Sequence, residues 1–280
     1  MTMNHQSKPA ISSTHVRLSD IVEKLEGHAP LTLAESWDNV GLLAGDLDLP
    51  VHRIMTCLTI SRETVREAIE SGVQLVVAHH PLPFKPLQRI VTSTAVGQSL
   101  WPLIREGIAI YSPHTAWDSA SNGINARLAA WLNLIDVRPI RTIEIENQES
   151  RVGVGRIGRL EPTKSIGEIV NSLRNRLPSL TAFANQQVDR QIAHVAIVCG
   201  SGGSFVDAAR QRGADLLLTG EATYHQCLEA QSMNLGLLLI GHFASERFSM
   251  DALAGLLQTD FPTLDVWASR NECDPMLAIV

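Results

Sequence analysis

The 280-residue chain has no apolar run approaching the roughly 20 residues that a membrane helix needs, so we expect no membrane span. It also lacks a cluster of lysine and arginine: 23 basic residues stand against 29 acidic ones, for a net charge of -6. This disfavours a nucleic-acid binder, which needs a basic surface. Phosphate-bearing substrates remain open, because a bound metal ion reverses the local electric field.

Cysteine is scarce, with four widely spaced residues and no CxxC pair, which argues against a disulfide framework or a cysteine zinc site. Cys57 and Cys199 lie inside apolar, strand-like runs and are expected in the core. We therefore expect a reducing compartment, the cytoplasm. Residues 1–15 are polar and lack the apolar segment of a signal peptide, which predicts a disordered N-terminal tail.

Apolar strand-like runs alternate with helical periodicities along most of the chain, which predicts an α/β fold with mostly parallel strands. A Gly-rich, alternating segment at 151–160 is expected to be an edge or hairpin strand. We predict two interlinked α/β lobes with a metal site in the cleft between them. The first lobe comprises residues 16–138 plus 236–280 and carries the metal ligands, and the second comprises 139–235.

Polar residues follow three of the expected strands, where α/β proteins place their ligands. His79 and His80 end the apolar run at 74–78. Neighbouring side chains on an extended backbone point to opposite sides, which suits two adjacent metals better than one. For this pair alone, one hydrogen-bonded core histidine beside one surface histidine is an equally good interpretation.

The other two clusters supply carboxylates. Asp118 follows the strand expected at 108–112 and is either a bridging ligand of two metals or a cap of the next helix. His242 and Glu246 are four residues apart, so in a helix they share one face, although such pairs also occur by chance on solvated faces. The three clusters together favour a two-metal centre. Five side chains cannot saturate two ions, so water completes the coordination, as in a reactive site.

A glycine-rich segment, Gly200 to Gly203, lies between a strand and a helix and either cradles a phosphate or forms a plain turn. Phe205 takes the place of the third glycine of a dinucleotide fingerprint, so that motif fails. Glu221 and His225 follow the next strand. They are candidates for contacts to a ligand or substrate, with ordinary helix capping as the alternative.

These residues, in this order, resemble the NIF3-like family, the NIF-three-like dinuclear metal proteins also called type 2 homologues of GTP cyclohydrolase I. The resemblance spans Val16 to Ala268. Its carriers are Trp37-Asp38-Asn39-Val40-Gly41-Leu42, His79-His80-Pro81, His114-Thr115 with Asp118, Gly200-Ser201-Gly202-Gly203, Thr219-Gly220-Glu221 and Gly241-His242 with Ser245-Glu246.

The resemblance implies that the family's metal ligands fall on His79, His80, Asp118, His242 and Glu246. It also implies two interlinked lobes and a toroidal homohexamer whose metal sites face an internal cavity. Many relatives have an acidic residue near the position of Leu58, so the role of that acid is not carried over here.

We therefore expect two divalent ions per chain (Zn, Fe, Mn or Ni, the ions that imidazole and carboxylate suit) and a metal-dependent hydrolase. Its expected substrate is a nucleotide or another phosphate-containing small molecule, with His114 or Glu221 as general acid or base. A rival hypothesis is a ring-forming metal-binding protein without turnover. A third, a nucleotide-dependent oxidoreductase, depends on the Gly200 segment alone.

Overall fold

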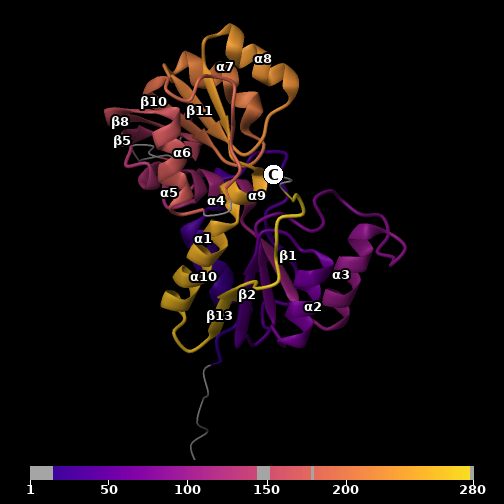
Figure 1. The fold of residues 1–280 in the computed structure, drawn as a ribbon. Helices are drawn as coiled ribbons and strands as arrows, with labels where there is room; N and C mark the ends of the chain where they lie inside the picture. The colour runs from indigo at the N-terminus through magenta and orange to yellow at the C-terminus, as the bar shows by residue number, and fades with distance from the viewer. Residues whose placement is uncertain (1–14, 144–151, 178–179, 278–280) are drawn as a thin grey trace, which may run out of the picture.

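The computed structural model describes residues 15–143, 152–177 and 180–277, which form two sheet-centred lobes joined through shared helices (Figure 1). The tail predicted for residues 1–15 lies outside the described residues, except for His15. The α/β prediction is confirmed, but only part of the strands pair in parallel, rather than most of them. Within the described residues, no helix is both long and apolar enough to span a membrane.

The first lobe is built on a five-stranded sheet of order β1-β4-β3-β2-β13. These strands are β1 (Gly41–Ala44), β4 (Ala109–Ser112), β3 (Leu75–Ala78), β2 (Arg53–Cys57) and β13 (Asp265–Ala268). All pair in parallel except β1, which runs antiparallel to β4. The sheet is flanked by α1 (Leu18–His28), α2 (Arg62–Glu70), α3 (Ala95–Arg105) and α10 (Phe248–Asp260).

Alternation along the strands sends apolar side chains to both faces of this sheet. Ile54, Leu75 and Val77 join the core cluster that holds α1 and α10, whereas Met55 and Val76 join the cluster that holds α2 and α3. The helices α1 and α10 lie side by side (Figure 1), and His28 Nε2 is 2.6 Å from Asp260 Oδ2. The first lobe is thus a three-layer α/β unit.

The second lobe has a six-stranded mixed sheet of order β5-β8-β10-β11-β12-β9. These strands are β5 (Ile135–Arg138), β8 (Arg156–Ser165), β10 (Gln191–Val198), β11 (Leu216–Thr219), β12 (Gly236–Leu239) and β9 (Phe183–Ala184). Only β10, β11 and β12 are parallel. The helices are α5 (Ile124–Trp131), α6 (Ile166–Arg174), α7 (Val206–Gln211) and α8 (Tyr224–Ser232).

Two features of this sheet differ from the sequence-based expectation. Of the two alternatives for 151–160, an edge strand or a hairpin strand, the edge strand is wrong: β8 lies between β5 and β10 and pairs antiparallel with both. The first residues of β8 are buried. The alternating pattern that predicts an edge strand cannot show that a second strand pairs with β8 on its other side. Strand β12 pairs with β11 in the second sheet, whereas the division at residue 235 placed it with the first lobe. A short apolar run does not reveal which sheet it joins.

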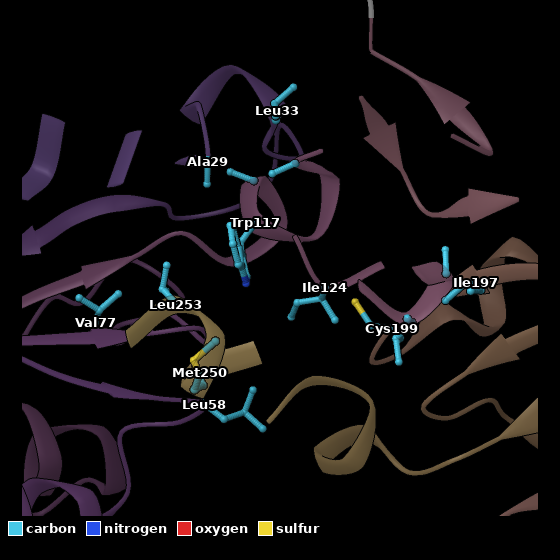
Figure 2. Close-up of a cluster of buried hydrophobic side chains, with 14 of the residues drawn as sticks. Ala29, Leu33, Leu58, Val77, Trp117, Ile124, Ile197, Cys199, Met250 and Leu253 are labelled. Atoms are coloured by element: carbon cyan, nitrogen blue, oxygen red, sulfur yellow. The ribbon is translucent and has the colours of Figure 1, made fainter. Parts of the chain in front are cut away.

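One core cluster runs through both lobes (Figure 2). It includes Val77 of the first sheet and Ile197 of the second, with Trp117 and Ile124 between them. Trp117 lies on α4 (His114–Ser119), a short helix that Figure 1 places at the junction of the lobes near α9 (His242–Glu246). This continuous packing fixes the strand ends of one lobe against those of the other. The remaining elements are η1 (Leu31–Leu33), η2 (Gly202–Phe205) and the small pair β6 (Arg141–Thr142) and β7 (Gly153–Val154).

Candidate metal centre

The histidine pair lies immediately beyond β3, where the backbone is still extended. The amide of His79 donates to the carbonyl of Cys57 (2.9 Å), and that of His80 donates to the carbonyl of Leu58 (2.8 Å), so both residues continue the pairing with β2. Their side chains consequently differ in surroundings. The His79 side chain is fully buried, whereas that of His80 is 26% exposed.

Two short helices supply the other candidate ligands in the same way. Helix α4 follows β4 of the first sheet and carries His114 and Asp118, and α9 follows β12 of the second sheet and carries His242 and Glu246. In each helix the imidazole and the carboxylate are four residues apart, so they share one face. Each lobe therefore contributes one histidine–carboxylate pair from the helix that follows a strand.

The five predicted ligands meet between the lobes. Possible ligand atoms of His79, His80 and His114 lie within 4.8 Å of one another, and so do those of His80, His242 and Glu246. The two groups share His80. Asp118 joins the first group, because its Oδ1 lies 3.6 Å from His79 Nε2. His80 and His242, which are 162 positions apart in the chain, thus belong to one continuous cluster, and the described residues can hold a metal ion.

The first group has the character of a cation site. Neither ring nitrogen of the buried His79 has a hydrogen-bond partner among the described residues. Burial holds the pKa of His79 well below its usual range, and burial together with the charge of Glu246 raises the pKa of Asp118 to about 7. A buried imidazole without a partner, beside a partly buried carboxylate, is costly unless a cation binds both. Imidazole and carboxylate donors suit Zn, Fe, Mn or Ni.

In the second group, one carboxylate already has partners. Glu246 Oε2 lies 3.1 Å from His80 Nε2 and 3.0 Å from His242 Nε2. Burial alone would raise the pKa of Glu246, but the hydrogen bonds from His242 and His80 lower it below its ordinary value. The bond to Glu246 in turn raises the pKa of His242 to about 9. A proton on His242 thus occupies the position where a cation would compete with it.

Three of the imidazoles are oriented through Nδ1 by a neighbouring oxygen. His114 Nδ1 is 2.8 Å from Asp38 Oδ1, His242 Nδ1 is 3.0 Å from Glu221 Oε1, and His80 Nδ1 is 2.7 Å from Thr59 Oγ1. In His80 and His242, Nε2 faces the centre of the cluster, 3.3 Å from its counterpart. Such outer partners fix the ring and the tautomer of metal-ligating histidines.

Asp38 is the most firmly held of these partners. Its side chain is fully buried and also accepts hydrogen bonds from the amide (3.1 Å) and hydroxyl (2.5 Å) of Thr115. Burial would raise the pKa of Asp38, but the bonds from His114 and Thr115 lower it. Glu221 is more exposed, and its pKa is lowered by hydrogen bonds from Ser201 and His242. Glu221 therefore contacts a predicted ligand directly.

The Gly200 segment is shaped by its approach to Glu246. Gly200 has a φ of +60°, and a Cβ there would lie 2.2 Å from Glu246 Oε1. The amide of Gly200 donates to Ser245 Oγ (3.0 Å), and that of Gly202 donates to Thr219 Oγ1 (2.9 Å). Because these two amides bond within the protein, they are not directed at a phosphate. The plain-turn interpretation is sufficient for Gly200, because its positive φ and its close approach to Glu246 both require a glycine.

Sequence reasoning assigned no role to several residues around the centre. Thr59 and Asp38 orient ligands, and Glu272 accepts from the amides of Leu58 (2.9 Å) and Thr59 (2.7 Å) beside His80. Asp38 belongs to a motif that carries the family resemblance, which was a usable signal, whereas nothing in the sequence singles out Glu272. His225, a candidate from the sequence, lies on α8 with its ring against Tyr224 and belongs to neither ligand group.

The match to a family model decides the relationship of the chain to known proteins. The model of Duf34/NIF3 (NGG1p interacting factor 3) matches residues 16–275. The chain belongs to the Duf34/NIF3 family. The resemblance inferred from the motifs is thereby confirmed.

Relatives match over most of their length. The chain is 36% identical to a GTP cyclohydrolase 1 type 2 homolog of Clostridium perfringens, covering 82% of the chain and 87% of that protein. It is 31% identical to NIF3-like protein 1 of Drosophila melanogaster, covering 94% and 89%. Among solved structures, Staphylococcus aureus hypothetical protein SA1388 is 28% identical with a TM-score of 0.84, covering 94% and 99%. A Bacillus cereus protein related to NIF3 shares the fold at 23% identity, with a TM-score of 0.85 over 95% and 100%.

Proposed function

We propose that this Duf34/NIF3 protein binds two divalent metal ions, held by His79, His80, Asp118, His242 and Glu246. The observation that supports this most is the buried, unbonded ring of His79 beside Asp118, adjoining a second group of ligands through His80. Shared ligands bring two cations close together, which is the arrangement of two-metal hydrolytic centres.

We further propose a metal-dependent hydrolase that acts on a nucleotide or another phosphate-containing small molecule. When bound, the two ions lower the pKa of water and polarise the bond under attack. His114, held by Asp38, is positioned to accept or return a proton at Nε2. Glu221 keeps the ring of His242 in place. The names of the relatives that match as GTP cyclohydrolase 1 type 2 homologs make a guanine nucleotide the first substrate to assay.

The rival proposal is a hexameric metal-binding protein without turnover. It is supported by the same ligand set, because a metal site by itself requires no reaction. We also propose a toroidal homohexamer in the cytoplasm for either function, on the basis of the family resemblance.

Turnover assays on metal-reconstituted protein separate the two proposals. We expect hydrolysis of GTP or of a phosphoester that is lost on chelation and lost in His79→Ala and Glu246→Ala, with the oligomer preserved by light scattering. His225→Ala is the matched control, since that histidine lies outside both ligand groups, and it should retain turnover. Absence of turnover across a broad panel, with the metals bound, would leave the binding role.

A further inference from the structure

Two large aromatic rings lie exposed beside the candidate metal centre. Trp37 precedes β1 and is 60% exposed, and Phe84 follows β3 and is 47% exposed. Their ring centres are 6.0 Å apart, and each lies about as far from the ring of His114, at 6.2 Å for Trp37 and 6.1 Å for Phe84. His114 in turn contacts the rings of His79 and His80. The aromatic pair therefore adjoins the predicted ligands without being one of them.

Polar contacts tie together the two segments that carry this pair. Asn39 Nδ2 donates to the carbonyl of Pro83 (2.7 Å), which ties the segment of Trp37 to that of Phe84. Asp38, next to Trp37, is bound by Thr115 and His114 of α4. Fixed aromatic faces lose little entropy when a ligand stacks on them. Trp117, in contrast, is fully buried in the core.

The charge of the neighbouring segment favours an anionic ligand. Residues 81–94 contain Lys85 and Arg89 and no acidic residue, although the chain as a whole carries a net charge of -6. Both cations are exposed, and neither forms an ion pair with another described residue. Planar rings beside unpaired cations are the features that proteins use to bind a nucleobase together with its phosphates.

We propose that Trp37 and Phe84 bind the planar heteroaromatic ring of a nucleotide, and that Lys85 and Arg89 attract its phosphates. This proposal rests on the proposed function, because it specifies the substrate class of the same site. A ring on the Trp37–Phe84 pair would lie next to His114. The reacting part of the nucleotide would thus be presented to the side of the centre where His79 and His80 meet.

The test is calorimetric titration of the metal-loaded full chain with GTP, ATP and inorganic triphosphate. We expect both nucleotides to bind more tightly than triphosphate, since the ring adds stacking. Trp37→Ala and Phe84→Ala should each weaken nucleotide binding by about 5- to 100-fold, and Trp37→Phe should recover most of it. Metal content should stay at the wild-type value in these variants, which shows that the centre is intact.

The chain offers matched controls for both rings. Trp101 on α3 and Phe183 on β9 are also exposed, and neither belongs to a ligand group. Trp101→Ala and Phe183→Ala should bind nucleotides as the wild type does. Equal affinity for nucleotides and triphosphate, or wild-type nucleotide binding by Trp37→Ala, would overturn the proposal. So would a change of oligomeric state in Trp37→Ala, because the exposed Leu87, Ile90 and Val91 nearby would then mark a surface covered by a second copy.

The outcomes separate this proposal from the proposed function. If the wild type hydrolyses glycerol phosphate but does not bind nucleotides, the aromatic proposal fails and the hydrolase stands. If nucleotides bind through Trp37 but no substrate is turned over, the aromatic proposal stands and the hydrolase fails.

Discussion

The two halves of the candidate centre differ in how their polar groups are satisfied. In the first half, His79 is buried with no hydrogen bond, and Asp118 receives one from the thiol of Cys199 (3.2 Å). In the second half, protonated His242 donates to both Glu246 and Glu221, so its single positive charge balances one of the two carboxylates. In the protein without metal, the unfavourable free energy of burying unpaired polar groups therefore lies mainly in the first half. The second half is stabilised by a proton, which a metal ion must displace.

The largest effect expected is that of the shared ligand. His80→Ala should abolish binding at both proposed positions, because His80 belongs to both groups. His79→Ala should lose the first position only, and His242→Ala the second only. Calorimetric titration of chelated protein with Zn or Mn measures the number of ions bound by each variant. Loss of the same number of ions in all three would show that the centre does not divide into two halves.

The orienting carboxylates give the next effect. Asp38→Asn should weaken metal binding in the first half, because Asp38 holds His114 within ligand distance of His79 and His80. Glu221→Gln should weaken it in the second half, because Glu221 holds His242. We expect each effect to be about 10- to 100-fold. We expect the larger loss for Asp38→Asn, since Asp38 is fully buried and fixed by Thr115, whereas Glu221 is more than half exposed. Competition with a chelating dye measures both affinities. A larger loss for Glu221→Gln would reverse our view of which half is more rigid.

The close approach of Gly200 to Glu246 can be tested by substituting Gly200 and, as a matched control, Gly72. Gly200 and Gly72 have nearly the same φ, +60° and +62°, but a Cβ at Gly72 meets nothing within 4 Å. Ala at either position should cost about 1 kcal/mol of unfolding free energy through backbone strain. Only Gly200→Ala should also displace Glu246 and weaken metal binding in the second half. Urea unfolding and metal titration of both variants separate strain from crowding, and equal metal binding by the two would contradict the assignment.

The smallest effect is on the pH dependence of the protein without metal. Burial raises the pKa of Asp118 from 3.8 to about 7. The folded state therefore binds this proton more tightly than the unfolded state, and its contribution to stability is complete below pH 4 and lost as pH rises through 7. Asp118→Asn has no carboxylate to ionise and so avoids this loss of stability. At pH 7 to 8 the variant should therefore have a higher Tm than the chelated wild type, corresponding to a free energy of unfolding larger by an amount on the order of 1–2 kcal/mol.

Thermal melts from pH 4 to 8 check this expectation. His79 shifts stability in the opposite direction as pH falls, but the comparison at pH 7 to 8 is unaffected, because burial holds the pKa of His79 well below 6.5 and leaves the ring uncharged there. Added metal should raise the Tm of the wild type more than that of Asp118→Asn, because a cation neutralises the carboxylate. An Asn variant less stable than the chelated wild type at pH 8 would show that the Asp118 carboxylate is not destabilising there.

The sequence was most informative for site residues that can be located from the pattern of their own strand or helix. His79 and His80 could be located because an apolar run ends at Ala78, and His242 and Glu246 because four residues make one helical turn. The apolar run at 74–78 is likewise observed as strand β3.

Long-range pairing was not accessible in the same way. The contact of Thr59 with His80, and of Glu272 with the amides of residues 58 and 59, joins segments whose own patterns carry no sign of each other. The membership of β12 in the second sheet was equally hidden, since Leu237 and Leu238 are buried on both faces and would suit either sheet. Asp38 had a signal in its motif, but its role required the position of α4.

The metal content of the wild-type protein tests the central claim most directly. Elemental analysis of protein purified without chelators, normalised to chain concentration, should give about two divalent transition-metal ions per chain. A value near zero, in protein that is folded and does not take up added Zn, Mn, Fe or Ni, would contradict the account.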